Sequence, residues 1–220
     1  MNKRRILSFE PWSYILLVAV VFTTFFVTLF PFEWHKGLYK FLFMVIYFSG
    51  IFNLERHRRQ VIYLSLVVLL FDLISILFDM AILGLASRVL NIIFFSYIVG
   101  ALVFQIARAK TVNAKVIMES INGYLLIGIV FAIVVAITAE IDPSGFNFHN
   151  TPSSGTFNPS QFSQDLYYTL ITMATVGYGD MLPLKPFTRS LATMIAITGQ
   201  LYVAIIIAML VGKFASQRKD

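Results

Sequence analysis

The segment around residue 177 has the residue types of a backbone that could coordinate an ion. It reads Thr175-Val176-Gly177-Tyr178-Gly179. Carbonyl oxygens are uncharged acceptors that can replace the water around a dehydrated cation without holding it too tightly. A ladder of carbonyls turned to one side needs unusual backbone angles, and Gly177 and Gly179 tolerate them. Thr175 could add its hydroxyl at one end of the ladder. In a soluble protein the same string would instead be a strand followed by a turn.

The residues before this segment predict a short helix over Ser163–Ala174. Ser163 is its expected N-cap, with Asp165 near the positive end of the helix dipole. The partial negative charge at the C-terminal end would favour a waiting cation. We expect Val176 and Tyr178 to point away from the carbonyl ladder and to pack it against this helix.

The pentapeptide and its flanks resemble the pore loop of potassium channels. The flanking matches are Thr172, Asp180 and Pro183, and the resemblance covers roughly residues 120–214. It implies that Thr175, Val176, Gly177, Tyr178 and Gly179 form a selectivity filter, with K⁺ bound at the first four. It also implies support of the filter by Thr172 and by a hydrogen bond from Tyr167 to Asp180.

Composition places the chain in a membrane. Of its 220 residues, 58% belong to the set AVILMFWYC and 13% are charged, against about 45–50% and about 25% in soluble domains. A soluble enzyme, a disordered chain and a collagen-like repeat are thereby excluded. The absence of cysteine removes disulfides, zinc clusters and thiol nucleophiles. The net charge of +6 fits basic residues flanking membrane spans rather than nucleic-acid binding. We expect no enzymatic activity and no cofactor other than permeant K⁺.

Six apolar runs are long enough to cross a bilayer as helices, if Lys40 snorkels from the second run. They are Trp12–Phe30, Gly37–Leu54, Val61–Phe78, Val89–Ala107, Ser120–Ala139 and Ser190–Gly212. A seventh run, Leu166–Leu182, is shorter and contains Gly and Asp, so it is a poor spanning helix. The predicted fold is an all-α membrane protein with six transmembrane helices, a re-entrant pore helix and a filter loop.

The distribution of basic residues sets the expected orientation. With these spans, 12 of the 17 Lys and Arg residues fall on the side of the N-terminus, which predicts that both termini are cytoplasmic. The seventh run must then enter and leave from the outside. Non-helical backbone at membrane depth is tolerated where it lines an aqueous cavity or is buried in protein. The chain is thus expected in the cytoplasmic or plasma membrane as a multi-pass protein.

Two domains follow from this order. Residues 1–115 are expected to form a four-helix peripheral domain that resembles a voltage-sensor domain without its charge ladder. Residues 116–220 are expected to form a pore domain. Its parts are an outer helix (120–139), an extracellular loop (141–162), a pore helix (163–174), the filter (175–179) and an inner helix (188–212). One filter segment cannot surround an ion, so four identical chains are required around one axis.

The last span contains the expected gate. Gly199 resembles the inner-helix glycine of potassium channels, and it fits equally a hinge and a close helix contact. One stripe of this helix is expected to line the cavity and narrow its inner end; it consists of Gln200, Val203, Ile207 and Val211.

The fourth span lacks the charges that voltage sensing requires. No basic residue lies between Arg88 and Arg108, so we expect weak or absent voltage dependence. Asp72 is the one acidic residue within a span. We expect it to pair with Arg88, and a proton-sensing role is the alternative.

The sequence therefore predicts a passive, potassium-selective, homotetrameric channel. A less selective cation channel and a non-conducting or modulatory membrane subunit remain as alternatives.

Overall fold

The computed structural model describes residues 11–53, 58–78, 81–109, 111–148 and 158–217. Every named element in these ranges is helical. The long helices are α2 (Phe32–Asn53), α3 (Arg58–Phe78), α4 (Ala81–Arg108), α5 (Ala114–Ile141) and α7 (Pro186–Gln217), and two helices are shorter, α1 (Pro11–Val21) and α6 (Pro159–Met173). Short helical turns follow α1 (η1, Phe22–Phe26; η2, Val27–Leu29) and α5 (η3, Pro143–Gly145).

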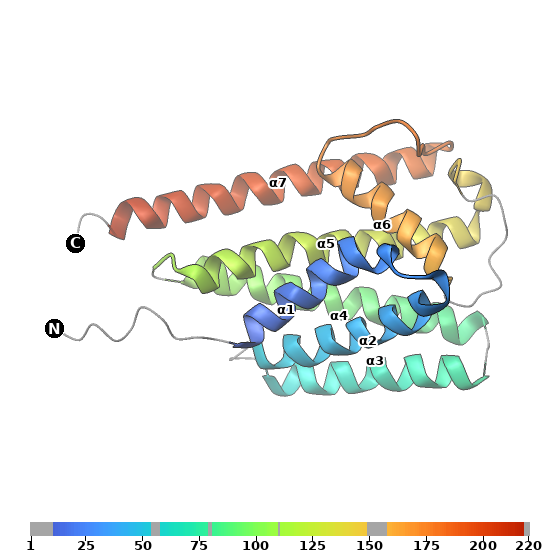
Figure 1. The fold of residues 1–220 in the computed structure, drawn as a ribbon. Helices are drawn as coiled ribbons and strands as arrows, with labels where there is room; N and C mark the ends of the chain where they lie inside the picture. The colour runs from blue at the N-terminus through green and yellow to red at the C-terminus, as the bar shows by residue number, and fades with distance from the viewer. Residues whose placement is uncertain (1–10, 54–57, 79–80, 110, 149–157, 218–220) are drawn as a thin grey trace.

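The long helices lie side by side in a bundle, with α5 between the first four helices and α7 (Figure 1). The first residue of α1 and the last residue of α7 lie at the same end of the bundle. The short helix α6 packs against α5 and α7 at the other end. After α6 the chain turns back toward that same end before α7 begins (Figure 1).

Four described helical segments are long and apolar enough to cross a membrane. They are Pro11–Leu29, Ile82–Arg108, Ala114–Ile141 and Pro186–Ser216. The described part of α3 contributes a shorter apolar stretch, Val61–Ile74, and α2 carries Glu33, Lys36 and Lys40 in its first half. Length and composition thus identify a multi-pass membrane protein with at least four candidate spans.

The sequence of residues 12–30 had suggested one regular helix, but the structure of this first apolar run is irregular. The π-helical turn of η1 follows α1 directly, and a 3₁₀ turn closes the run. The hydroxyls of Thr23 and Thr24 donate to the carbonyls of Ala19 and Val20, both at 2.7 Å. Such bonds to the carbonyl four residues earlier often bend helices.

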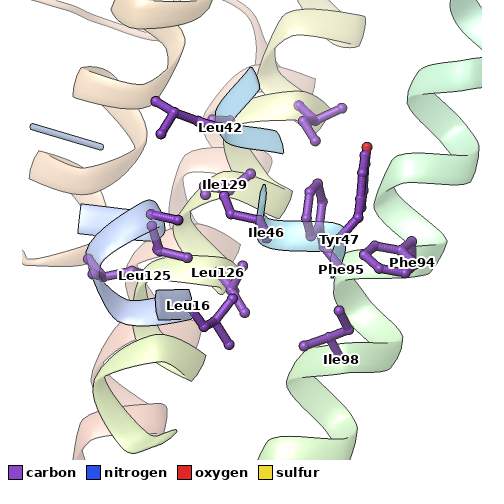
Figure 2. Close-up of a cluster of buried hydrophobic side chains, with 14 of the residues drawn as sticks. Leu16, Leu42, Ile46, Tyr47, Phe94, Phe95, Ile98, Leu125, Leu126 and Ile129 are labelled. Atoms are coloured by element: carbon purple, nitrogen blue, oxygen red, sulfur yellow. The ribbon is translucent and has the colours of Figure 1, made fainter. Parts of the chain in front are cut away.

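The apolar core joins the peripheral helices to α5. The side chains labelled in Figure 2 belong to this core and come from α1, α2, α4 and α5. They are Leu16, Leu42, Ile46, Tyr47, Phe94, Phe95, Ile98, Leu125, Leu126 and Ile129. Between helices in lipid, close van der Waals packing of this kind is a main source of association.

The predicted ion pair between Asp72 and Arg88 is wrong. Asp72 of α3 accepts hydrogen bonds from Ser87 and from Asn91, the latter at 3.2 Å. Arg88 instead forms an ion pair with Glu140 at the end of α5. Consecutive residues of a helix point about 100° apart, so Ser87 faces α3 while Arg88 faces α5.

Candidate functional site

Helix α6 begins four residues earlier than the sequence had suggested. Its N-cap is Asn158, whose side chain accepts from the Ser160 amide at 3.2 Å, and Pro159 occupies the first helical position. Ser163, the expected cap, lies inside the helix and its hydroxyl donates to the Ser160 carbonyl at 2.8 Å. An asparagine followed by proline is a good start signal, so the sequence did contain the boundary.

The first turns of α6 are anchored to α2. Phe162 is buried, and its ring meets that of Tyr39 edge-on with centroids 5.3 Å apart. A second ring of α2, Phe43, lies 6.0 Å away. This aromatic contact fixes the helix that leads into the predicted filter.

The backbone of the predicted filter folds back onto the end of α6. The Thr175 amide donates to the Thr172 carbonyl at 3.0 Å. The amides of Val176 and Gly177 both donate to the Ile171 carbonyl, at 2.9 and 3.2 Å. Free carbonyls at a helix end need partners, and this segment supplies them.

Positive φ angles occur at every second residue of the predicted filter. They are 59° at Thr175, 50° at Gly177 and 84° at Gly179. Glycine adopts such angles without penalty, whereas a threonine held there stores about 1–3 kcal/mol of strain. When the sign of φ alternates in this way, successive peptide groups turn toward the same side, whereas in a regular strand they would point to opposite sides. The backbone therefore has the local geometry expected of a carbonyl ladder.

One face of the predicted filter is free within the single chain. Val176 is 51% exposed and Tyr178 is 73% exposed. A Cβ built on Gly177 or Gly179 would meet nothing within 4 Å. Val176 and Tyr178 are largely exposed in the single chain, so their expected packing against the pore helix stays a prediction.

The expected contact at the outer end of the filter is present. The Tyr167 hydroxyl of α6 donates to Asp180 Oδ2 at 2.8 Å. The Thr172 hydroxyl donates within α6, to the Tyr168 carbonyl at 2.7 Å. Thr172 thus stabilises the last turns of the helix rather than contacting the predicted filter with its hydroxyl.

The structure contains a loop contact beyond the predicted filter that sequence analysis did not predict. The backbone of Asn147 pairs with that of Leu182, and an isolated antiparallel bridge joins Phe146 to Pro183. Nearby, Lys185 Nζ lies 2.5 Å from Asp142 Oδ2. This lysine donates to the carboxylate and lowers the pKa of Asp142. These pairs link residues 35 to 43 positions apart, a distance at which the sequence carries no local signal.

Helix α7 crosses the end of α6 at Gly199. A Cβ on Gly199 would lie 2.3 Å from the carbonyl oxygen of Met173 and 2.4 Å from its Cγ. A close helix contact therefore requires glycine here. The predicted stripe lies on the exposed part of α7, which is longer at both ends than predicted; the stripe residues are Gln200, Val203, Ile207 and Val211.

Helix α7 is also hydrogen-bonded to the C-terminal end of α4 and to the first turns of α5. Lys213 Nζ donates to the carbonyls of Ile106 and Ala107, the latter at 2.8 Å. A lysine at the C-terminal end of a helix satisfies free carbonyls and complements the helix dipole. The Tyr202 hydroxyl donates to the Ser120 carbonyl at 2.8 Å.

Comparison with known proteins points to ion channels. Residues 136–216 match the family model described as "Ion channel". The chain is 30% identical over 91 residues to mouse "Potassium voltage-gated channel subfamily A member 10", covering 41% of this chain and 16% of that protein. It is 31% identical over 101 residues to "Potassium voltage-gated channel protein shk-1" of Caenorhabditis elegans, covering 46% and 18%.

A bacterial relative matches a shorter stretch. "Inward rectifier potassium channel Kirbac3.1" of Paramagnetospirillum magnetotacticum is 32% identical over 56 residues, covering 26% of this chain and 19% of that protein. The chain thus spans less than a fifth of the length of these curated relatives. No solved structure gives a significant match. The C-terminal part of this chain, which includes α6, the predicted filter and α7, matches the ion channel family model and is similar to potassium channels.

Proposed function

We propose that the protein is a passive, potassium-selective channel in which residues 175–179 form the selectivity filter. The observation that carries this proposal is the alternation of positive φ at Thr175, Gly177 and Gly179, in the pentapeptide that resembles a potassium filter. The family match over residues 136–216 supports it independently. It also favours a transport protein over an enzyme.

The chemistry of the filter follows from its backbone. We expect K⁺ to bind at carbonyl oxygens of Thr175, Val176, Gly177 and Tyr178. Gly179 is the last residue at the outer end of the filter. These oxygens replace the hydration shell, and successive sites let ions leave as readily as they enter. The C-terminal end of α6, with its partial negative charge, directs cations toward the inner end.

A homotetramer supplies the oxygens that one chain lacks. Each chain carries one such pentapeptide, and its outer face, with Val176 and Tyr178, is exposed when the chain is alone. Four copies related by one axis would surround an ion and cover these side chains with the neighbouring chain. The exposed stripe of α7 would then face the shared cavity, where apolar side chains such as Ile207 can gate by dewetting.

The topology we propose has six spans and a re-entrant loop. Helix α6 and the segment after it start and return at one end of the bundle, while the first residue of α1 and the last residue of α7 lie at the other (Figure 1). With the basic residues mostly on the side of the termini, both termini are cytoplasmic and the filter opens to the outside. The membrane is the cytoplasmic or plasma membrane.

Voltage dependence is weak or absent in this proposal. Sensing requires several charges that move through the membrane field. Of the two arginines of α4, Arg108 is the last residue and Arg88 lies two turns after the start. Each is engaged: Arg88 with Glu140, and Arg108 over the ring of Phe104 at 4.1 Å. The ion pair of Arg88 fastens α4 to α5 and opposes such movement.

Potassium flux from liposomes tests the channel function. Purified protein in potassium-loaded vesicles should release K⁺, and Ba²⁺ should block the release. The matched control is Gly177→Ala, because a Cβ disfavours the φ of 50° at this position. Equal flux from this variant would refute the filter assignment, and no flux from the unsubstituted protein would favour a non-conducting subunit.

A further inference from the structure

The segment that follows α5 pairs with the segment that follows the filter. The Asn147 amide donates to the Leu182 carbonyl at 3.1 Å, and the Leu184 amide donates to the Gly145 carbonyl at 2.8 Å. Together with the bridge between Phe146 and Pro183, these bonds form a short antiparallel pair. We call residues 145–147 and 182–184 the outer strap.

The side chain of Asn147 reaches past the outer strap to the end of the filter. Its Nδ2 donates to the Asp180 carbonyl at 3.1 Å, and its Oδ1 accepts from the Leu182 amide at 2.7 Å. One planar amide thus holds two backbone groups two residues apart. The two bonds require a donor and an acceptor on the same short side chain, which only asparagine provides at this length.

The outer strap is itself anchored to both helices of the site. Phe146 is 1% exposed, and its ring meets that of Tyr168 of α6 edge-on at 5.4 Å. The Thr188 hydroxyl of α7 donates to the Gly145 carbonyl at 2.8 Å. A Cβ on Gly145 would lie 2.8 Å from Thr188 Cγ2, so the two segments are in close contact. Contacts with α6 and α7 therefore hold the backbone beside Asn147 in place.

Asp180, the residue directly after the filter, is held on two sides. Its side chain accepts from the Tyr167 hydroxyl of α6 at 2.8 Å. Its carbonyl accepts from Asn147. The tyrosine fixes the carboxylate, whereas the asparagine fixes the backbone, and the backbone is what continues into Gly179.

We propose that Asn147 is a positioning residue that holds the outer end of the selectivity filter through the Asp180 carbonyl and the Leu182 amide. This inference rests on the proposed channel function. Without Asn147, the outermost carbonyls are no longer held in register, and the filter leaves its ion-binding arrangement more often. Because bound K⁺ stabilises that arrangement by mass action, raising external K⁺ should compensate for the loss.

Two variants separate the two bonds. Asn147→Ala removes both, whereas Asn147→Asp keeps the acceptor for Leu182 and places a negative oxygen against the Asp180 carbonyl. Ser144→Ala is the matched control, because Ser144 lies in the same loop and its hydroxyl donates to Asp142 instead. The full-length protein in liposomes is measured by amide hydrogen exchange and by the persistence of K⁺ current in low and high external K⁺.

The proposal predicts a distinct pattern. In Asn147→Ala, exchange of the Leu182 amide should rise roughly tenfold, as expected for the loss of one hydrogen bond and its support. In Asn147→Asp it should stay close to the unsubstituted rate. In both variants, the K⁺ current should persist for a roughly tenfold shorter time in low external K⁺, and high external K⁺ should restore much of this persistence. A purely structural role would instead reduce the amount of assembled protein without dependence on K⁺.

Several results would overturn the inference. Unchanged exchange of Leu182 in Asn147→Ala would reject the bond, and unchanged current persistence in both variants would reject the role at the filter. Failure of the unsubstituted protein to conduct would reject the channel function itself, and the exchange pattern would still decide whether Asn147 holds residues 180–182.

Discussion

Alanine at position 199 tests the contact between α7 and the end of α6. The new Cβ would lie 2.3 Å from the backbone oxygen of Met173, and ordinary contact begins near 3.4 Å. The two helices must therefore separate by about 1 Å, because a backbone carbonyl cannot turn aside as a flexible side chain can. Overpacking of this kind costs about 1–3 kcal/mol.

The helix itself gains about 1 kcal/mol when glycine becomes alanine. Because the clash at Gly199 involves backbone, we expect the upper part of the overpacking range, and hence a net loss of about 2 kcal/mol. Gly212→Ala is the matched control on the same helix, since its Cβ meets nothing within 4 Å. This control should leave the protein as stable as before or raise its stability by up to about 1 kcal/mol.

Thermal unfolding and K⁺ flux of the two variants measure the effect. Gly199→Ala should lower the unfolding temperature and reduce flux, because Met173 directly precedes the turn into the filter, whereas Gly212→Ala should do neither. An unfolding temperature equal to that of the unsubstituted protein would refute the close contact. If only the open probability changed, the hinge interpretation of Gly199 would replace it.

Three further substitutions test other parts of the structure. Arg88→Gln should destabilise the fold by about 2 kcal/mol, a value between those for breaking surface and buried ion pairs. In thermal unfolding, the double variant Arg88→Gln/Glu140→Gln should recover part of this loss. A changed voltage dependence of the current would contradict the anchoring role. Because Lys185 lowers the pKa of Asp142, this carboxylate stabilises the fold above its ordinary pKa of about 3.9 and stops doing so as pH falls through the lowered value. The unfolding temperatures of Asp142→Asn and the unsubstituted protein should therefore differ at neutral pH and converge in strongly acidic buffer; a gap that persists in acid would contradict the pair. Ile207→Asp should raise the open probability by wetting the inner cavity, and unchanged single-channel gating would count against the stripe.

Local patterns predicted the parts of the site that local chemistry determines. The helix before residue 175 and the positive φ angles at Gly177 and Gly179 follow from local residue types. The Tyr167–Asp180 bond joins positions that the pore-loop resemblance brings together, and the filter assignment, which rests on the same resemblance, stays a prediction. The start of α6 was missed although Asn158 and Pro159 marked it, because Ser163 offered a second plausible cap.

Contacts over long sequence distances could not be predicted in the same way. The bonds of Asn147 depend on how the loop after α5 returns over α6, which no periodicity encodes. Arg88 was assigned to Asp72 because both lie toward the outer half of the predicted bundle. Its true partner, Glu140, is determined by the rotation of α4, and charge positions along a sequence do not define that rotation.

The reversal potential of the purified protein tests the central claim most directly. Opposed gradients of K⁺ and Na⁺ across a planar bilayer separate a potassium filter from a general cation pore. The proposed carbonyl ladder of residues 175–179 predicts a reversal potential close to the equilibrium potential of K⁺. A value near zero, or one that follows Na⁺ equally, would contradict potassium selectivity through this backbone.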